Sequence, residues 1–311
     1  LRLALLIMMP VALVACDPGG RLAQLTPQPP LATTIPPGLN GEVAPGSVAS
    51  STDQPIAGAT TAIPTPVPTH DPSIPAWTIL YYAVAGGREA FVSGDLNEME
   101  ASRPGDQVRI VAQVDWPEQN PAGTAAARYL IQPDEDPASL TSPVATSLGE
   151  VNMGDPATLA SFIAWGIQTY PANHYALILG DFGGGWQGCC LDTEAGQDGQ
   201  GDHLSLPDLD VALSSAGAQT GGARLDIIAL SAGLMNQMDV LQYLQPYANY
   251  FVGSAGLMPG STWDYQSTIT EIGSDPLAPG GQVAGTMVSS FVNHQRQAQQ
   301  NEQVGMAAVD L

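Results

Sequence analysis

The pattern of hydrophobic and polar positions changes twice along the chain. Residues 3–15 form an unbroken apolar run that follows Arg2. Residues 17–75 contain 13 of the 27 prolines and no aromatic residue. From Trp77 onward, short apolar runs alternate with amphipathic segments. The pattern therefore predicts three parts: an N-terminal segment (1–15), an extended segment (16–75) and a folded domain (76–311).

Six short runs in the third part predict β-strands. The first of them, residues 77–85, is a continuous β-prone apolar run, which is typical of a strand covered on both faces. The runs are residues 77–85, 108–114, 128–131, 175–179, 225–230 and 250–253. Residues 308–311 resemble the start of a further strand.

Helical patterns separate these strands. Asp155 can cap a helix with Pro156 at its first position, and Ser205 with Asp208 resembles a capping box. Residues 234–246 and 281–299 also read as helices. Strands that alternate with helices predict an α/β fold whose mostly parallel sheet lies between helices. Ligands and chemistry gather beyond the carboxyl ends of such strands, which here means residues 180–186 and 231–235.

Charge narrows the classes of function. Eight basic residues, all Arg, stand against 30 acidic residues, and the net charge is −22. A surface this acidic repels phosphate backbones, so we expect no nucleic-acid partner and favour a cationic peptide or protein. The three cysteines, Cys16, Cys189 and Cys190, are too few for a disulfide scaffold or a four-cysteine zinc site.

The N-terminal segment has the length of a secretory signal rather than of a membrane-spanning helix. Its end, Leu13-Val14-Ala15-Cys16, resembles the cleavage box of bacterial lipoproteins. The resemblance implies a lipidated Cys16, a membrane anchor and an extracytoplasmic location; an ordinary secretory signal with a chance cysteine is the alternative. Residues 16–75 have the composition of a Pro/Thr-rich disordered tether between that anchor and the domain.

The third part contains, in this order, segments 95–100, 149–154, 170–179, 183–186 and 204–209, and Pro259-Gly260 before Trp263-Asp-Tyr265. Together these segments resemble the clostripain-like cysteine peptidases, whose sheet is shared with caspases. The resemblance covers residues from about Trp77 to the chain end. It implies a caspase-like fold with a catalytic His after one strand and a nucleophilic Cys after the next. A base that close to a thiol generates the reactive thiolate.

This chain departs from the family pattern at both catalytic positions. Phe182, between Asp181 and Gly183, stands where the resemblance places the His, and Gly233 stands where it places the Cys. Ser231 replaces the acid two residues before the nucleophile. Because neither Phe nor Gly can transfer a proton or attack a carbonyl, we expect an inactive pseudopeptidase. Its degenerate cleft would bind a peptide or protein partner without cleaving it.

Two alternatives stay open. An active peptidase with a relocated nucleophile would use Cys189 or Cys190, which we expect near the rim of the cleft, with His203 as the only plausible base. A structural cell-surface module would have its cleft filled by Phe182, Leu257 and Met258.

An acidic, glycine-rich stretch follows the two cysteines. Asp192, Glu194, Asp198 and Asp202 supply hard oxygen ligands of the kind that calcium prefers, although their order does not match an EF-hand. Calcium is therefore a candidate cofactor, and a solvated acidic loop is the alternative. The resemblance adds that some relatives are calcium-dependent.

Overall fold

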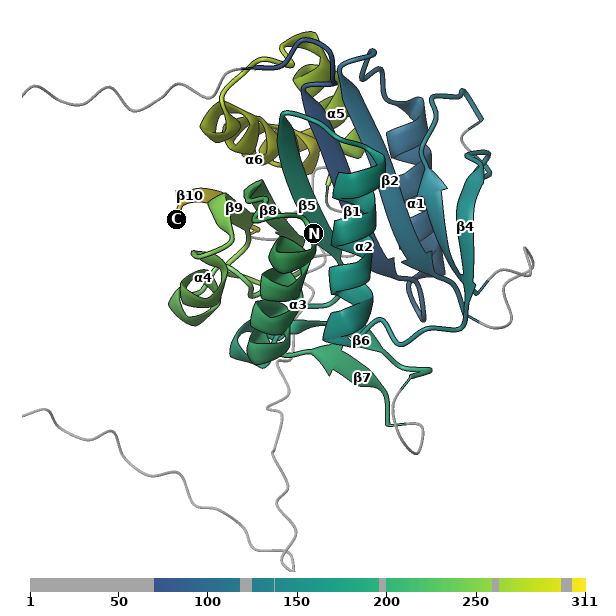
Figure 1. Cartoon of the computed structure of the whole chain (residues 1–311), viewed down its shortest axis with the longest axis vertical. Helices are drawn as coiled ribbons and strands as arrows, with labels where there is room; N and C mark the ends of the chain where they lie inside the picture. The colour runs from purple at the N-terminus through teal and green to yellow at the C-terminus, as the bar shows by residue number, and fades with distance from the viewer. Residues whose placement is uncertain (1–69, 118–124, 137, 196–199, 259–262, 298–303) are drawn as a thin grey trace, which may run out of the picture. The chain divides into compact units, whose positions relative to one another are not determined.

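A computed structural model describes residues 70–311, apart from residues 118–124, 137, 196–199, 259–262 and 298–303. The predicted signal peptide, Cys16 and nearly all of the predicted tether lie outside the described residues. An eight-stranded sheet in the order β10-β9-β8-β5-β1-β2-β3-β4 forms the centre of the domain (Figure 1). The strands are β1 (Trp77–Val84), β2 (Val108–Asp115), β3 (Ala126–Leu130), β4 (Val144–Gly149), β5 (His174–Gly180), β8 (Leu225–Ser231), β9 (Ala248–Gly253) and β10 (Ala307–Asp310).

The five strands from β9 to β2 are parallel, whereas β3, β4 and β10 join the sheet antiparallel. The predicted α/β class with a mostly parallel sheet is therefore confirmed. A separate two-stranded sheet pairs β6 (Cys189–Asp192) with β7 (Asp202–Leu204), and this hairpin lies at the lower edge of the domain in Figure 1.

Helices cover both faces of the sheet. One buried core contains side chains of α1 (Glu89–Ala101), α5 (Tyr265–Ser274) and α6 (Gly280–Gln297). The core on the other face contains side chains of α2 (Pro156–Thr169), α3 (Leu206–Gln219) and α4 (Met238–Leu244), which lie in front of the sheet in Figure 1. In the part of the chain that the structure describes, no helix combines the length and hydropathy needed to span a bilayer.

The local signals read from the sequence agree well with the elements. Asp155 accepts a hydrogen bond from the backbone N–H of Ala157, and Ser205 and Asp208 form both bonds of a capping box. The helix expected at residues 234–246 begins only at Met238, because Leu234 has a φ of 65° and the chain turns there. The sequence did not predict α1, α5, β4 or the β6–β7 hairpin.

Candidate functional site

The loops that follow β5 and β8 lie directly against each other. Gly180 and Ser231, at the ends of these strands, are paired in register. A Cβ atom added to Gly183 would lie 2.1 Å from the carbonyl oxygen of Gly233. The structure therefore brings the segment that contains Phe182 beside the segment that contains Gly233, at the carboxyl edge of the parallel strands, as adjacent parallel strands require.

The aromatic side chain of Phe182 is exposed to solvent. Its exposed fraction is 62%, and the Arg88 guanidinium lies 5.1 Å from its ring centroid. Arg88 also contacts the buried carboxylate of Asp181 at 3.4 Å. Burial raises the pKa of Asp181 to about 7, and the Arg88 charge opposes that rise. Position 182 thus offers a cation–π contact and no proton donor or acceptor.

Gly233 lies against a third loop, which follows β9. A Cβ atom at Gly233 would meet the Met258 nitrogen at 3.1 Å and the Gly256 oxygen at 3.3 Å. The N–H of Leu234 donates to the same Gly256 oxygen at 2.8 Å. The neighbours therefore leave little room for a side chain, although a shift of a few tenths of an ångström would admit one.

Apolar side chains from these loops face solvent. Leu257 is 74% exposed and Trp186, in the short 3-10 helix η1 (Gly185–Gln187), is 67% exposed. Because Phe182 and Leu257 are both largely exposed, they do not fill a cleft in the way that the structural-module alternative requires.

Cys189 and Cys190 lie beside the loop that carries Phe182, as expected of residues near the rim of the cleft, but neither thiol is accessible there. Both thiols are buried in the core that α2 and α3 cover, with 3% and 0% exposure. The Sγ atoms lie 2.9 Å apart, and this contact and burial raise the pKa of Cys190 well above its ordinary value. His203, the proposed base, is exposed on β7. A buried thiol with a raised pKa is a poor nucleophile.

The acidic residues group differently from the expected loop. Carboxylate oxygens of Asp115, Glu150 and Asp192 lie within 4.8 Å of one another. Asp202 instead accepts a hydrogen bond from Asn152 at 2.6 Å, and Asp198 lies outside the described residues. Asp115 and Glu150 were not among the expected ligands, although Asp115 ends a strand and Glu150 lies in segment 149–154.

The Asp115–Glu150–Asp192 cluster has the donor chemistry of a calcium site. Asp192 is buried and already accepts backbone N–H bonds from Met153, Glu194 and Ala195. Burial, followed by the neighbouring carboxylates, raises the pKa of Asp115 to about 8. The buried Oδ1 atom of Asp115 has no hydrogen-bond partner among the described residues. These oxygens fit a hard divalent cation, with Asp115, Glu150 and Asp192 as its ligands.

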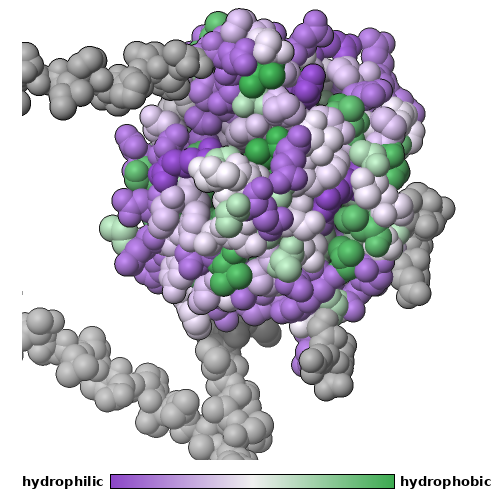
Figure 2. Space-filling model, viewed as in Figure 1, coloured by the Kyte–Doolittle hydropathy of each residue, from purple (hydrophilic) through white to green (hydrophobic). Residues whose placement is uncertain are grey.

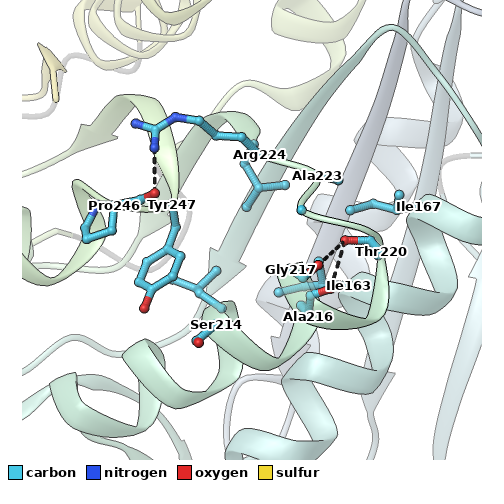
Figure 3. A pocket seen from close by; sticks show the side chains of 13 residues that line it. Ile163, Ile167, Ser214, Ala216, Gly217, Thr220, Ala223, Arg224, Pro246 and Tyr247 are labelled. Atoms are coloured by element: carbon cyan, nitrogen blue, oxygen red, sulfur yellow. Dashed lines mark hydrogen bonds between the residues drawn. The ribbon is translucent and has the colours of Figure 1, made fainter.

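A pocket of about 350 Å³ lies between α2 and α3, far along the strands from this edge, beside Leu225 at the start of β8 (Figure 3). Arg224 is its charged residue. Its guanidinium donates to the carbonyl oxygens of Gln245 and Pro246, and its Nε donates to Asn249. These bonds tie the residue that precedes β8 to β9 and to the segment before β9, so we interpret Arg224 as structural.

The face of the domain that α2 and α3 cover shows no large apolar surface. In Figure 2 hydrophobic residues form small groups that are separated by hydrophilic ones. Small, scattered groups of this kind do not mark a binding face in this view.

Comparisons with known proteins agree with the fold. The family model described as the clostripain family matches residues 81–311. Clostripain of Hathewaya histolytica is 26% identical over 172 residues, which are 48% of this chain and 32% of that protein. The chain therefore spans about a third of the length of this curated relative.

Two solved structures have the same fold. A secreted cysteine protease from Bacteroides thetaiotaomicron, in complex with an irreversible peptide inhibitor, superposes with a TM-score of 0.62 at 20% identity, covering 76% of this chain and 66% of that one. An inactive zymogen protease from Parabacteroides distasonis gives 0.58 at 18% identity, covering 78% and 63%.

Proposed function

The chain belongs to the clostripain family, and from this premise we propose that its domain binds a peptide or protein partner without cleaving it. The observation that carries the proposal is the pair of residues at the two adjacent strand ends. Phe182 is an exposed aromatic residue held by Arg88, and Gly233 has no side chain. In peptidases that work by a nucleophile and a base, loss of one member lowers turnover by about 10⁶-fold, and here both are replaced.

The burial of the two cysteines supports this proposal over a relocated nucleophile. The thiols lie in the core rather than in the loops that follow β5, β8 and β9. His203 is exposed on the hairpin while both thiols are shielded from solvent. A substrate carbonyl would have to enter the hydrophobic core to reach either sulfur atom.

The partner that fits this edge is cationic with apolar side chains. The chain carries a net charge of −22, and Phe182, Trp186 and Leu257 expose apolar surface beside the contact between the strand-end loops. Acidic fields attract cationic partners, and exposed aromatic side chains are frequent anchors of interfaces.

The proposal also includes anchoring of the domain to the cell membrane. The lipoprotein-like box at Cys16 supports anchoring to the outer face of the bacterial cell membrane, with residues 16–75 as a tether. Two acyl chains, unlike one, anchor a protein stably. Metabolic labelling with an alkyne fatty acid should mark the chain and fail to mark Cys16→Ser; equal labelling of the two would contradict the anchor.

Calcium binding at the Asp115–Glu150–Asp192 cluster is the second part of the proposal. The unpartnered Oδ1 atom of Asp115 favours it, because a bound cation would satisfy that oxygen and neutralise the repulsion among the carboxylates. When bound, calcium would supply fixed positive charge that links three chain segments.

Incubation with arginyl, lysyl and mixed peptide libraries tests the absence of cleavage. The purified chain, with and without calcium and with and without iodoacetamide, should give no hydrolysis that alkylation abolishes. Fluorescence anisotropy with the same cationic peptides should report binding that weakens as salt is added. Hydrolysis that is sensitive to alkylation would overturn the proposal, and so would the absence of binding to every peptide at low salt.

Restoring the family residues tests the assignment of the two positions. The double variant Phe182→His with Gly233→Cys should acquire weak, alkylation-sensitive activity, while Phe182→His with Gly233→Ala should acquire none. The alanine control adds the same Cβ atom that meets Met258 and Gly256 but provides no thiol. Equal activity of the two double variants would contradict the assignment.

A further inference from the structure

Cys189 and Cys190 are arranged in an unusual way for neighbours on a strand. Successive side chains of a β-strand point to opposite faces. In β6, however, both cysteines are buried in the same core and their Sγ atoms lie 2.9 Å apart. This separation is longer than a covalent S–S bond but short for a contact between two thiols. The backbone therefore directs both sulfur atoms to one point.

The cause lies in the backbone of Cys190. Its φ is 65°, a left-handed conformation that residues other than glycine rarely adopt. Among the described residues only Leu234 shares this property. The pairing of β6 with β7 is irregular between Cys189 and Asp192, as in a β-bulge. Residues in such sparsely populated conformations persist where the surrounding structure holds them, often for a functional reason.

The surroundings exclude a catalytic reason for bringing the thiols together. Both are shielded from solvent, so a substrate group does not reach either sulfur atom in the folded domain. The arrangement suits a bond between the two sulfur atoms better than attack on a third group.

We propose that Cys189 and Cys190 are a modification site at which a disulfide joins the two neighbouring residues in the exported protein. The inference rests on the extracytoplasmic location in the proposed function, because disulfides form and persist in oxidising compartments. The oxidant is a disulfide-bearing thiol compound of the glutathione class. One cysteine thiolate attacks that disulfide and releases one thiol. The second cysteine then displaces the other half, so two protein thiols become one disulfide and one oxidant disulfide becomes two thiols.

The exchange takes place before β6 pairs with β7, since the thiols are inaccessible once the domain has folded. The resulting bond would lock the conformation of the first two residues of β6, which contact the loop that follows β5. The N–H of Cys190 donates to the carbonyl of Phe182 at 3.4 Å, and Cys189 forms a bridge with Gly183. The disulfide therefore holds in place the loop that carries Phe182 and Trp186.

Peptide mass analysis tests the bond directly. The chain is exported by a bacterial host, denatured, alkylated with iodoacetamide without reductant and digested with trypsin. Because no Arg or Lys lies between Arg128 and Arg224, one peptide, residues 129–224, contains both cysteines and excludes Cys16. We expect this peptide to be unalkylated and lighter by two hydrogens, and to gain two alkyl groups only after reduction. Two alkyl groups without reduction, added oxygen or a link to another peptide would overturn the proposal.

A matched variant checks the chemistry and the effect on the loop. The Cys190→Ala peptide should carry one alkyl group without reduction, which shows that a lone thiol at position 189 reacts under these conditions. An unalkylated, unlinked peptide from this variant would contradict the pairing. Hydrogen exchange of residues 182–188 should be faster in the unmodified chain after it has been reduced in denaturant and refolded with a phosphine reductant present. Unchanged exchange in a chain shown to be reduced would overturn the proposed hold on the loop. Neither measurement depends on peptidase activity, so a failure here is distinct from a failure of the proposed function.

Discussion

Asp95, in α1, has a side-chain carboxyl group that is buried in the folded domain. Its Oδ2 atom accepts a hydrogen bond from the Tyr81 hydroxyl at 2.7 Å. Burial raises the pKa of Asp95 to about 7, because desolvation penalises the charged form more than the Tyr81 bond and Arg88 favour it. The folded state therefore holds a proton that the unfolded state releases near pH 4.

This linkage predicts how the stability of the domain depends on pH. Between about pH 4 and pH 7 the folded state binds more protons than the unfolded state, so the free energy of unfolding falls as the pH rises. Asp95→Asn keeps a neutral acceptor for Tyr81 and removes this contribution. From pH 5 to pH 8 we expect the variant to gain on the order of 2 kcal/mol relative to the unmodified protein, measured by urea denaturation.

Comparing Asp95→Asn with the unmodified protein controls for the other carboxyl groups with raised pKa values, such as Glu98, because both proteins contain them. Parallel stability curves for Asp95→Asn and the unmodified chain would contradict a proton held at Asp95.

At the scale of elements, the interior glycines of α1 and α2 have different surroundings. Gly94 lies on the exposed side of α1, and a Cβ atom there would meet nothing within 4 Å. Gly166 lies in α2, where a Cβ atom would come 2.1 Å from Cδ2 of the fully buried Leu80. Only the second glycine is required by the packing of its helix on the sheet.

The same substitution should therefore have opposite effects in the two helices. Gly94→Ala should raise the free energy of unfolding by about 0.5–1 kcal/mol, because alanine restricts the unfolded chain and favours the helix. Gly166→Ala should lower it by about 1–3 kcal/mol through overpacking against Leu80. Thermal or urea denaturation measures both, and a stabilised Gly166→Ala would show that α2 is not packed on β1 as described.

At the scale of the whole molecule, the carboxylate cluster joins segments that are distant in the sequence. Asp115 ends β2, Glu150 follows β4 and Asp192 ends β6. A cation bound by all three would tie the hairpin to the sheet. Binding to the folded state alone stabilises a protein in proportion to the logarithm of ligand concentration over the dissociation constant.

Calcium should therefore raise the melting temperature, and EDTA should reverse the effect. Glu150→Gln should weaken calcium binding at least tenfold by isothermal titration calorimetry, because it removes an exposed ligand without disturbing the buried Asp192. Glu271→Gln, which removes an exposed acid from α5, should leave the affinity unchanged. Equal weakening by both variants would show that calcium responds to the overall negative charge rather than to this cluster.

The sequence by itself determined most of the elements and their order. Asp155 and Ser205 mark helix starts through bonds to residues only two or three positions away, and runs such as residues 77–84 are apolar because helices cover both faces of the sheet. These signals depend on residues close together in the chain, so they can be read from the sequence without knowledge of the fold. The adjacency of positions 182 and 233 follows from them, since it needs only two neighbouring parallel strands.

The tertiary structure alone decided what surrounds the chemically active side chains. The sequence placed Cys189 and Cys190 near a cleft rim, whereas the left-handed backbone at Cys190 turns both sulfur atoms into the core. It grouped Asp192 with acids of its own loop, whereas the sheet brings it to Asp115 and Glu150. Burial and contacts between distant segments arise from packing that no short stretch of sequence encodes, and these contacts set the pKa values and the possible ligands of the site.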